Sequence, residues 1–308
     1  MRIGRSAWLT DTGRRRLRNE DAYVFEPPLF GIADGMGGAR AGEVAAGIAA
    51  AALKDARRDV DGEASLEAII GEANRRVWER SVADPHTAGM GTTVTVAYVD
   101  AAAERVVFGH VGDSRAYRLR GDELEQITTD HSLVAELVES GVLTPEEAER
   151  HPQRSAITRA VGTERAIEAD VFSLPARPGD LFLLCSDGLT DMLSEEEIAA
   201  VLVAADRDPT AAAEALVAAA NERGGEDNIT VVLFELAEGD PEPAPDEDPA
   251  DQEDAEAAAA DAIEATQADP DAEVRTHGAG PGGRLAALAF VALVVVVGML
   301  ALYWRIGR

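Results

Sequence analysis

Apolar side chains recur every three or four positions along two adjacent stretches in the first third of the chain. In the first stretch, within residues 43–58, these positions are Val44, Ile48 and Ala52, and in the second they are Leu66, Ile69, Ile70, Ala73 and Val77. An apolar stripe at this spacing is the face with which a helix packs against a core. The pattern therefore predicts two neighbouring amphipathic helices.

A different pattern follows, in which short apolar runs are separated by turn residues, as is typical of strands. The runs cover residues 92–99, 105–111, 115–119 and 124–127. Residues 120–123 join the last two runs. We expect the runs to pair with their sequence neighbours as an antiparallel meander.

Three later positions carry the start signals of helices, a capping side chain followed by proline or by a glutamate three residues on. They are Thr144-Pro145 with Glu147, Ser194 with Glu197, and Asp208-Pro209. The last of these helices ends near Gly224, and residues 229–234 are expected to form a closing strand. Since the helices are grouped and do not alternate with strands, the predicted fold class is α+β.

The composition changes sharply at the end of this pattern. Residues 1–236 alternate apolar runs with turn signals, whereas residues 237–284 are mostly Pro, Ala, Asp and Glu, with fifteen carboxylates against two arginines. A stretch with so few large apolar residues cannot bury enough surface to offset its chain entropy. We therefore expect a globular domain over residues 1–236 and a disordered acidic linker over residues 237–284.

A long apolar segment follows the linker. Residues 285–304 carry no charge over twenty positions. At ~1.5 Å per residue, a helix of this length spans the ~30 Å hydrocarbon core of a bilayer. Tyr303 and Trp304 suit a membrane interface, and arginines flank the segment. We predict one C-terminal transmembrane helix, followed by a short tail over residues 305–308.

The formal net charge of -29 argues against nucleic acid as a partner, because a negative field opposes binding to a polyanion. The arginine run from Arg14 to Arg16 is too short to form a basic tail. Cys185 is the only cysteine, and it lies in an apolar run. Neither an internal disulfide nor a thiolate metal site is therefore expected.

Acidic residues stand at turns that border the apolar strands, and two further runs of this kind, at residues 30–33 and 181–186, precede Asp34 and Asp187. The acidic residues are Glu20, Asp21, Asp34, Asp113, Asp187 and Asp227. In Asp34-Gly35 and Asp187-Gly188 the following glycine lets backbone oxygens come close to whatever the carboxylate holds. An ordinary turn is the alternative, because Asp-Gly pairs are common in turns. Strand ends of this kind can converge on one edge of a pair of sheets.

Carboxylates brought together repel one another unless protons or cations neutralise them. Oxygen ligands without clustered His or Cys select hard ions such as Mg²⁺ or Mn²⁺. Two such ions ~3.5 to 4 Å apart can hold a water as hydroxide and also grip phosphate oxygens. An arginine fork suits the remaining phosphate oxygens.

Eight short motifs follow one another along the domain. They are Thr10-Asp11-Thr12-Gly13 with Arg16 and Asn19-Glu20-Asp21; Asp34-Gly35-Met36-Gly37-Gly38; Gly91-Thr92-Thr93; Gly112-Asp113-Ser114-Arg115; Asp130-His131-Ser132; Thr158-Arg159-Ala160-Val161-Gly162; Ser186-Asp187-Gly188-Leu189; and Asp227-Asn228. Each motif alone is weak. In this order they resemble the bacterial branch of the metal-dependent serine/threonine protein phosphatases, the type-2C family, over residues 3–236.

The resemblance implies a four-layer α-β-β-α sandwich with two central antiparallel sheets and a metal site at one end. It implies that Asp34 bridges two Mn²⁺ or Mg²⁺ ions. Asp187 and Asp227 would complete the shell of one ion, and Asp21 and the backbone oxygen of Gly35 would serve the other.

Further positions match the family as well. Glu20 would act on a metal through water, Asp113 matches the position that holds a third, weaker metal, and Arg16 matches the phosphate-binding arginine. The implied reaction is attack of a metal-bound hydroxide in line on phosphorus. Met36 is a departure, because animal members have a histidine there as a candidate proton donor. Residues 131–161 correspond to a flap beside the cleft.

We therefore expect a phosphatase that acts on phosphoserine and phosphothreonine in proteins and opposes a bacterial Ser/Thr kinase. It would be anchored in the inner membrane with its catalytic domain in the cytoplasm, because residues 1–16 lack the apolar core of a signal peptide. Two alternatives stay open. One is a catalytically silent, membrane-tethered phosphoprotein-binding module, and the other is a phosphatase dedicated to an anti-sigma-factor antagonist.

Overall fold

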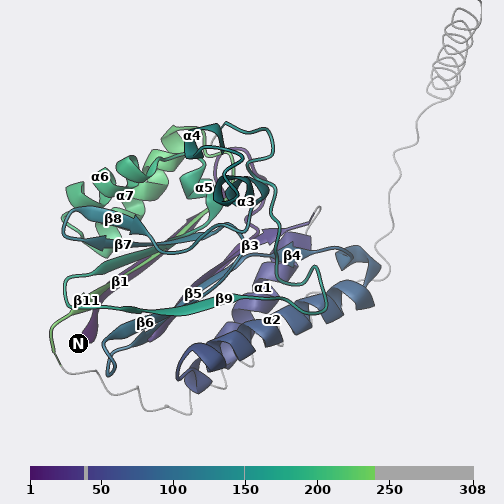
Figure 1. Cartoon of the computed structure of the whole chain (residues 1–308), viewed down its shortest axis with the longest axis horizontal. Helices are drawn as coiled ribbons and strands as arrows, with labels where there is room; N and C mark the ends of the chain where they lie inside the picture. The colour runs from purple at the N-terminus through teal and green to yellow at the C-terminus, as the bar shows by residue number, and fades with distance from the viewer. Residues whose placement is uncertain (38–40, 149, 240–308) are drawn as a thin grey trace, which may run out of the picture. The chain divides into compact units, whose positions relative to one another are not determined.

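Two antiparallel sheets lie face to face in the computed structural model, which describes residues 1–37, 41–148 and 150–239 (Figure 1). The first sheet has the order β1-β11-β10-β7-β8, and the second has the order β2-β3-β5-β6-β9, with β4 paired to β3. The strands are β1 Arg2–Asp11, β2 Asp21–Glu26, β3 Leu29–Met36, β4 Gly91–Thr92, β5 Val94–Asp100, β6 Arg105–Val111, β7 Arg115–Arg120, β8 Glu123–Gln126, β9 Asp170–Pro175, β10 Leu181–Cys185 and β11 Ile229–Ala237.

Two pairs of long helices cover the outer faces of the sheets. Helices α1 and α2 pack on the second sheet, and α6 and α7 pack on the first (Figure 1). The bounds of the α-helices are α1 Ala41–Asp55, α2 Glu63–Ala83, α3 Leu133–Glu139, α4 Pro145–Ala148, α5 Asp187–Thr190, α6 Glu195–Ala204 and α7 Pro209–Glu222, and short 3₁₀ turns occupy Arg57–Asp59 and Pro85–Thr87.

Three apolar cores separate these layers. One lies between the second sheet and α1 and α2, and another lies between the first sheet and α6 and α7. The third joins the two sheets and contains stacked rings, with the centroid of Phe234 4.4 Å from that of Phe30 and 5.1 Å from that of Phe182. The predicted α+β architecture with two antiparallel sheets is confirmed, and its layer order is α-β-β-α.

The predicted helix starts at Thr144, Ser194 and Asp208 are confirmed. The Ser194 hydroxyl accepts from the Glu197 amide while the Glu197 carboxylate accepts from the Ser194 amide, and Asp208 caps α7 through the Ala211 amide. The Thr144 backbone amide likewise donates to Glu147 Oε2. These caps satisfy amides that have no partner within their own helix.

The predicted meander is wrong. β5 pairs with β6, and β7 pairs with β8, but β6 and β7 belong to different sheets. The turn between β6 and β7 carries the chain across, and its residue Gly112 has φ +112°, which favours glycine. Almost every residue of β6 is buried, so the apolar pattern of this strand could not show which neighbour it pairs with.

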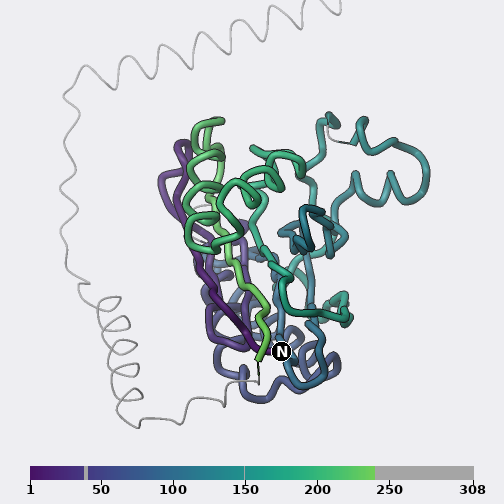
Figure 2. The backbone as a smooth tube through the Cα atoms, turned by 90° about the vertical axis from the view of Figure 1, so that its left-hand side faces the viewer, coloured from purple at the N-terminus to yellow at the C-terminus, as the bar shows by residue number. Residues whose placement is uncertain are grey.

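Three strands were not predicted, namely β1, β2 and β9. Their burial pattern is mixed, with few fully buried positions, so no clear apolar run marks them. β1 lies beside β11 along its length, which brings the first and last strands of the domain together (Figure 2).

Within the described residues, no helix is long and apolar enough to cross a membrane. The segment predicted to do so, residues 285–304, lies outside the described residues, as does the linker from residue 240 onward.

Candidate metal centre

The acidic residues predicted to form a site come from strand ends at one end of the sandwich. Asp21 begins β2 and lies directly opposite Asp34 of β3 in the strand register. Asp187 comes two residues after β10, and Asp227 comes two residues before β11, which is the antiparallel neighbour of β10. Since the end of one antiparallel strand lies beside the start of the next, these carboxylates face a common edge.

Two carboxylate oxygens at this edge are buried and have no hydrogen-bond partner. They are Asp21 Oδ1 and Asp187 Oδ1. The other oxygen of Asp21, Oδ2, accepts hydrogen bonds from Thr230 Oγ1 at 2.6 Å and Ser186 Oγ at 2.9 Å. A buried oxygen without a donor is unfavourable in a protein interior. Oxygens of this kind fit a hard divalent cation, which would supply the missing positive charge.

The pKa values of the clustered carboxyl groups are raised. Burial raises the pKa of Asp34 well above its ordinary value, and the negative charges of Asp21 and Asp187 raise it further. Burial also raises the pKa of Asp21 to about 7, although the hydroxyls of Thr230 and Ser186 act against it. Burial and then the charge of Asp113 raise the pKa of Asp187 well above its ordinary value. Without a cation, the cluster therefore retains protons near neutral pH.

Asp113 lies on the turn that links the two sheets. Its side chain is almost fully buried, and burial followed by the charge of Asp130 raises its pKa to about 6. Asp113 also acts on the pKa values of Asp34 and Asp187, so the structure brings it to the same cluster.

The backbone around Asp34 is held tightly. The Asp34 amide donates to Thr93 Oγ1 at 2.9 Å, and Thr92 Oγ1 donates to the Asp34 carbonyl at 2.8 Å. A Cβ atom added at Gly35 would lie 2.2 Å from the Gly42 carbonyl oxygen and 2.5 Å from the Glu20 carbonyl oxygen. Only glycine fits there, and its close packing keeps the backbone of Gly35 against that of Glu20.

Asn228 fixes the loop between β1 and β2 beside this cluster. Its Oδ1 accepts from the Glu20 amide at 2.8 Å. Its Nδ2 donates to the carbonyls of Thr12 at 3.0 Å and Arg18 at 2.8 Å. One side chain therefore holds both ends of the loop and the start of the segment that carries Glu20 and Asp21.

Arg16 and Asp227 form an ion pair, with Nη2 of Arg16 2.5 Å from Oδ2 of Asp227. Burial acts to lower the pKa of Arg16, but the charge and hydrogen bond of Asp227 raise it above the ordinary value. The second oxygen of Asp227 accepts from the Asn228 amide at 2.8 Å. Both oxygens of Asp227 therefore have donors, and this carboxylate must exchange a partner before it ligates an ion.

Within the part of the chain that the structure describes, no three Asp, Glu, His or Cys side chains are already arranged around one point as metal ligands. The hydrogen bonds above explain this, because Asp21 Oδ2 turns toward two hydroxyls and Asp227 Oδ2 turns toward Arg16. The donor set fits a divalent cation through its unpartnered oxygens, and side-chain rotation would complete the shell.

The predicted flap returns to the site at both of its ends. His131 lies at its start, accepts from the Gly112 amide through Nδ1 at 3.1 Å, and contacts Asp170 Oδ2 through Nε2 at 3.1 Å. Val161 forms a bridge with Thr92 at its other end. Arg154 within the flap is paired at 2.9 Å with Asp191, at the end of α5. His131 therefore supports the turn that carries Asp113 from the start of the flap.

Sequence reasoning missed the residues that orient the carboxylates. Ser186 and Thr230 are fully buried and donate to Asp21, yet Ser186 was named only as part of a motif, without this role, and Thr230 was not named. A signal existed for Thr230, because it is a hydroxyl residue inside the otherwise apolar start of β11. A polar residue in a buried strand needs a partner, and here that partner is a site carboxylate.

The chain is similar in sequence and in structure to known protein phosphatases. The sequence profile of the Protein phosphatase 2C family matches residues 14–222. The serine/threonine phosphatase stp of Listeria innocua is 41% identical over 238 residues, which cover 73% of this chain and 93% of that protein. The crystal structure of the Mycobacterium tuberculosis serine/threonine phosphatase PstP/Ppp superposes with a TM-score of 0.72 at 40% identity, covering 77% of this chain and 100% of that one. The catalytic domain of PstP in complex with two manganese ions has a TM-score of 0.70 at 38% identity, with 77% and 99% covered.

Proposed function

The chain belongs to the protein phosphatase 2C family and is a metal-dependent serine/threonine protein phosphatase, and we propose that its reaction takes place at the carboxylate cluster around Asp34. The observation that carries the proposal is the pair of buried, unpartnered oxygens of Asp21 and Asp187 at the edge where the strand ends meet. The substrates are phosphoserine and phosphothreonine side chains of proteins, and the cofactors are two Mn²⁺ or Mg²⁺ ions.

We propose that Asp34 contributes to both ions, because its charge interacts with those of Asp21, Asp187 and Asp227. Asp187 and Asp227 would serve one ion, and Asp21 with the Gly35 carbonyl would serve the other. In the same scheme Glu20 acts through a water, and Asp113 serves a third ion.

When bound, the ions supply an activated water and offset charge on the phosphoryl oxygens. The chain's own groups orient the ligands. Thr230 and Ser186 hold Asp21 through its Oδ2, which leaves its buried Oδ1 without a hydrogen-bond partner. Thr93 and Thr92 hold the backbone of Asp34, and Asn228 holds that of Glu20. Ligands fixed in this way lose little conformational freedom on binding.

Arg16 is proposed to bind the phosphate of the substrate. Its guanidinium already lies on a carboxylate, Asp227, and it is half exposed, so an incoming phosphate dianion can replace that partner. The exchange would free Asp227 Oδ2 for an ion. Met36 has no group that can donate a proton to the leaving oxygen, and we assign that role to no residue of this chain.

We further propose that the enzyme is anchored in the cell membrane by residues 285–304, with the domain in the cytoplasm, where it opposes a Ser/Thr kinase. The twenty uncharged residues and their flanking arginines support the anchor. Treatment of sealed inner-membrane vesicles with protease tests the orientation. Cleavage of the linker only from the cytoplasmic face is expected, and cleavage from the periplasmic face would overturn it.

The activity is tested with p-nitrophenyl phosphate and a phosphothreonine peptide in the presence of Mn²⁺, with Asp34→Asn as the control. Release of phosphate by the natural chain and not by the variant is expected. Equal turnover by both proteins, or none by either, would favour the silent phosphoprotein-binding module. An enzyme that rejects general phosphothreonine peptides but acts on a phosphorylated anti-sigma-factor antagonist would indicate the dedicated phosphatase.

A further inference from the structure

The loop between β1 and β2 carries a cluster of arginines, of which only Arg16 has a part in the proposed reaction. Its sequence from Arg14 to Arg18 is Arg-Arg-Arg-Leu-Arg, and all five residues are exposed. The Leu17 side chain is 99% exposed and packs against nothing in the described residues. Arg16 contacts Asp227, and Arg18 comes only to 3.9 Å from Glu43. Arg14 and Arg15 form no ion pair with any described carboxylate.

The loop is held rigidly at its base. The amides of Arg14 and Arg15 both donate to the Gly225 carbonyl, at 2.7 and 3.2 Å. A Cβ atom added at Gly225 would lie 3.0 Å from Arg14 Cγ and from its amide nitrogen. Asn228 clamps the carbonyls of Thr12 and Arg18, as described above. The backbone is therefore preorganised, and the two unpaired side chains start from fixed positions beside Arg16.

The chain has a net charge of -29, yet the guanidinium groups of Arg14 and Arg15 pair with no described carboxylate, so they are available to a carboxylate on another molecule. Consecutive Cα atoms are ~3.8 Å apart, so Arg14 and Arg15 begin within one or two residues of the arginine that is proposed to hold the phosphate. An extended substrate peptide advances ~3.3–3.6 Å per residue. Side chains a few positions from the phosphorylated residue therefore come within reach of this pair.

We propose that Arg14 and Arg15 bind acidic side chains that flank the phosphorylated residue of the substrate, so that the enzyme prefers phosphoserine and phosphothreonine in acidic sequences. The inference rests on the proposed function, because it assumes that Arg16 lies at the phosphate. A carboxylate is the group that a guanidinium fork binds best among peptide side chains. Each such exposed pair is weak and screened by salt, so the expected preference is roughly threefold to tenfold.

The test compares two phosphothreonine peptides that differ only in their flanks, one with Asp and Glu and the other with Asn and Gln. The full chain in detergent, loaded with Mn²⁺, is assayed on both at 50 mM and at 500 mM salt. The natural enzyme should favour the acidic peptide in kcat/KM at low salt and lose the preference at high salt. In the double variant Arg14→Gln/Arg15→Gln the ratio of the two kcat/KM values should fall to about one.

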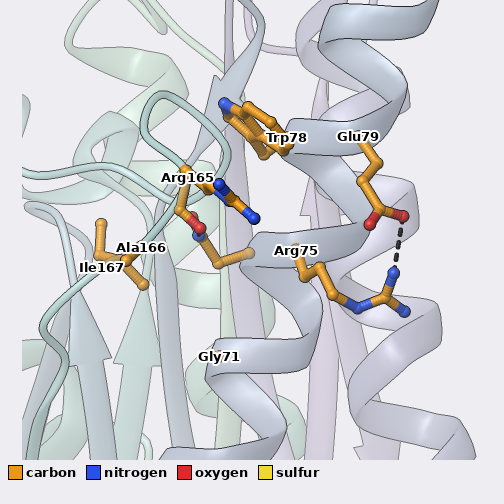
Figure 3. Close-up of a pocket in the computed structure, with 8 residues that line it drawn as sticks. Gly71, Arg75, Trp78, Glu79, Arg165, Ala166 and Ile167 are labelled. Carbon is orange, nitrogen blue, oxygen red and sulfur yellow. Dashed lines mark hydrogen bonds and ion pairs between the residues drawn. The ribbon is translucent and has the colours of Figure 1, made fainter.

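The matched control is the double variant Arg165→Gln/Arg177→Gln. It also removes two exposed arginines, and neither of them forms an ion pair with another described residue. Arg165 lies over the ring of Trp78, 5.9 Å from its centroid, and lines a surface cavity of about 380 Å³ beside α2 (Figure 3). Arg177 lies in the turn before β10, at the opposite end of that strand from Asp187. The control should keep the preference, because it changes the net charge equally but not the loop.

The possible results distinguish failure of the proposed phosphatase function from failure of the proposed preference for acidic flanks. Absence of turnover on p-nitrophenyl phosphate by the natural chain would count against the proposed function itself. Turnover with equal kcat/KM for both peptides, or a preference that both double variants lose alike, would overturn this inference alone. A further experiment measures binding of the natural chain and of the double variant to vesicles of anionic phosphatidylglycerol. Loss of vesicle binding in Arg14→Gln/Arg15→Gln with an unchanged peptide ratio would assign the loop to a lipid surface and overturn the peptide site.

Discussion

Asp21 lies directly opposite Asp34 across the β2–β3 pair, so the fold itself brings two carboxylates together before any ligand binds. Like charges opposite each other in a sheet are destabilising. The arrangement persists because hydroxyls hold one of them and protons or cations neutralise the cluster.

The stability of the metal-free protein should fall as pH rises from 6.5 to 8.5. The folded-state pKa values of Asp21, Asp34 and Asp187 are raised above their unfolded values, so the folded state keeps protons that the unfolded state has already released, and the stability that these protons add shrinks as pH rises toward the folded-state pKa values. The measurement starts at pH 6.5 because of two buried histidines. Burial lowers the pKa of His110 to about 3 and also lowers the pKa of His131. Below pH 6.5 these two groups make the stability rise with pH, which would mask the effect of the carboxyl groups.

Thermal unfolding in EDTA measures this, with an expected fall in Tm on the order of 3–6 °C. Asp34→Asn should flatten the slope, and Mn²⁺ should restore Tm at pH 8.5 through binding to the folded state. A Tm that stays constant or rises between pH 6.5 and 8.5 would show that the carboxylates do not hold protons in the folded state.

Gly35→Ala should destabilise the domain by about 1–3 kcal/mol, because its Cβ would overlap the carbonyl oxygens of Gly42 and Glu20. Gly47→Ala is the matched control within α1, since a Cβ added there meets nothing within 4 Å. The control should stabilise the helix by up to about 1 kcal/mol. Urea unfolding of both variants measures the difference, and an equal effect of the two changes would refute the close packing at Gly35.

Arg16→Ala should lower kcat/KM for a phosphothreonine peptide by roughly 10- to 100-fold, because a charge-assisted hydrogen bond to the substrate is lost. Arg16→Lys should recover only part of this, since an ammonium cannot bind two phosphate oxygens as a planar fork. Arg177→Gln serves as the control for the loss of one positive charge. If Arg16→Ala kept the natural kcat/KM, phosphate binding would have to be assigned to another group.

His131→Ala should destabilise the domain by about 2–4 kcal/mol. The residue is 3% exposed, and removal of its side chain leaves the Gly112 amide without its acceptor and creates a cavity. His86→Ala, at an exposed histidine, should change the free energy of unfolding by no more than about 0.5 kcal/mol. Equal stability of the two variants would show that His131 does not support the turn that carries Asp113.

The helices and the carboxylate set followed from local signals, such as caps at Ser194 and Asp208 and acidic residues at strand ends. The division of strands between sheets did not, because β6 is buried on both faces and pairs with residues of β9 that lie 60 to 70 positions later in the chain. The same holds for Ser186 and Thr230, whose bonds to Asp21 span 165 and 209 positions. Long-range contacts of this kind leave little trace in a local pattern.

The central claim is that the carboxylates around Asp34 hold divalent ions, and Mn²⁺ bound per chain at equilibrium tests it most directly. Equilibrium dialysis of the natural chain and of Asp34→Asn at pH 7.5, followed by elemental analysis, gives this number without reference to activity. We expect at least two Mn²⁺ per natural chain and a loss of these ions in Asp34→Asn. The acidic control Asp122→Asn, at an exposed residue in the turn after β7 and at the far end of that strand from Asp113, should keep two. A natural chain that binds no Mn²⁺, or an Asp34→Asn variant that binds as many ions as the natural chain, would contradict the account.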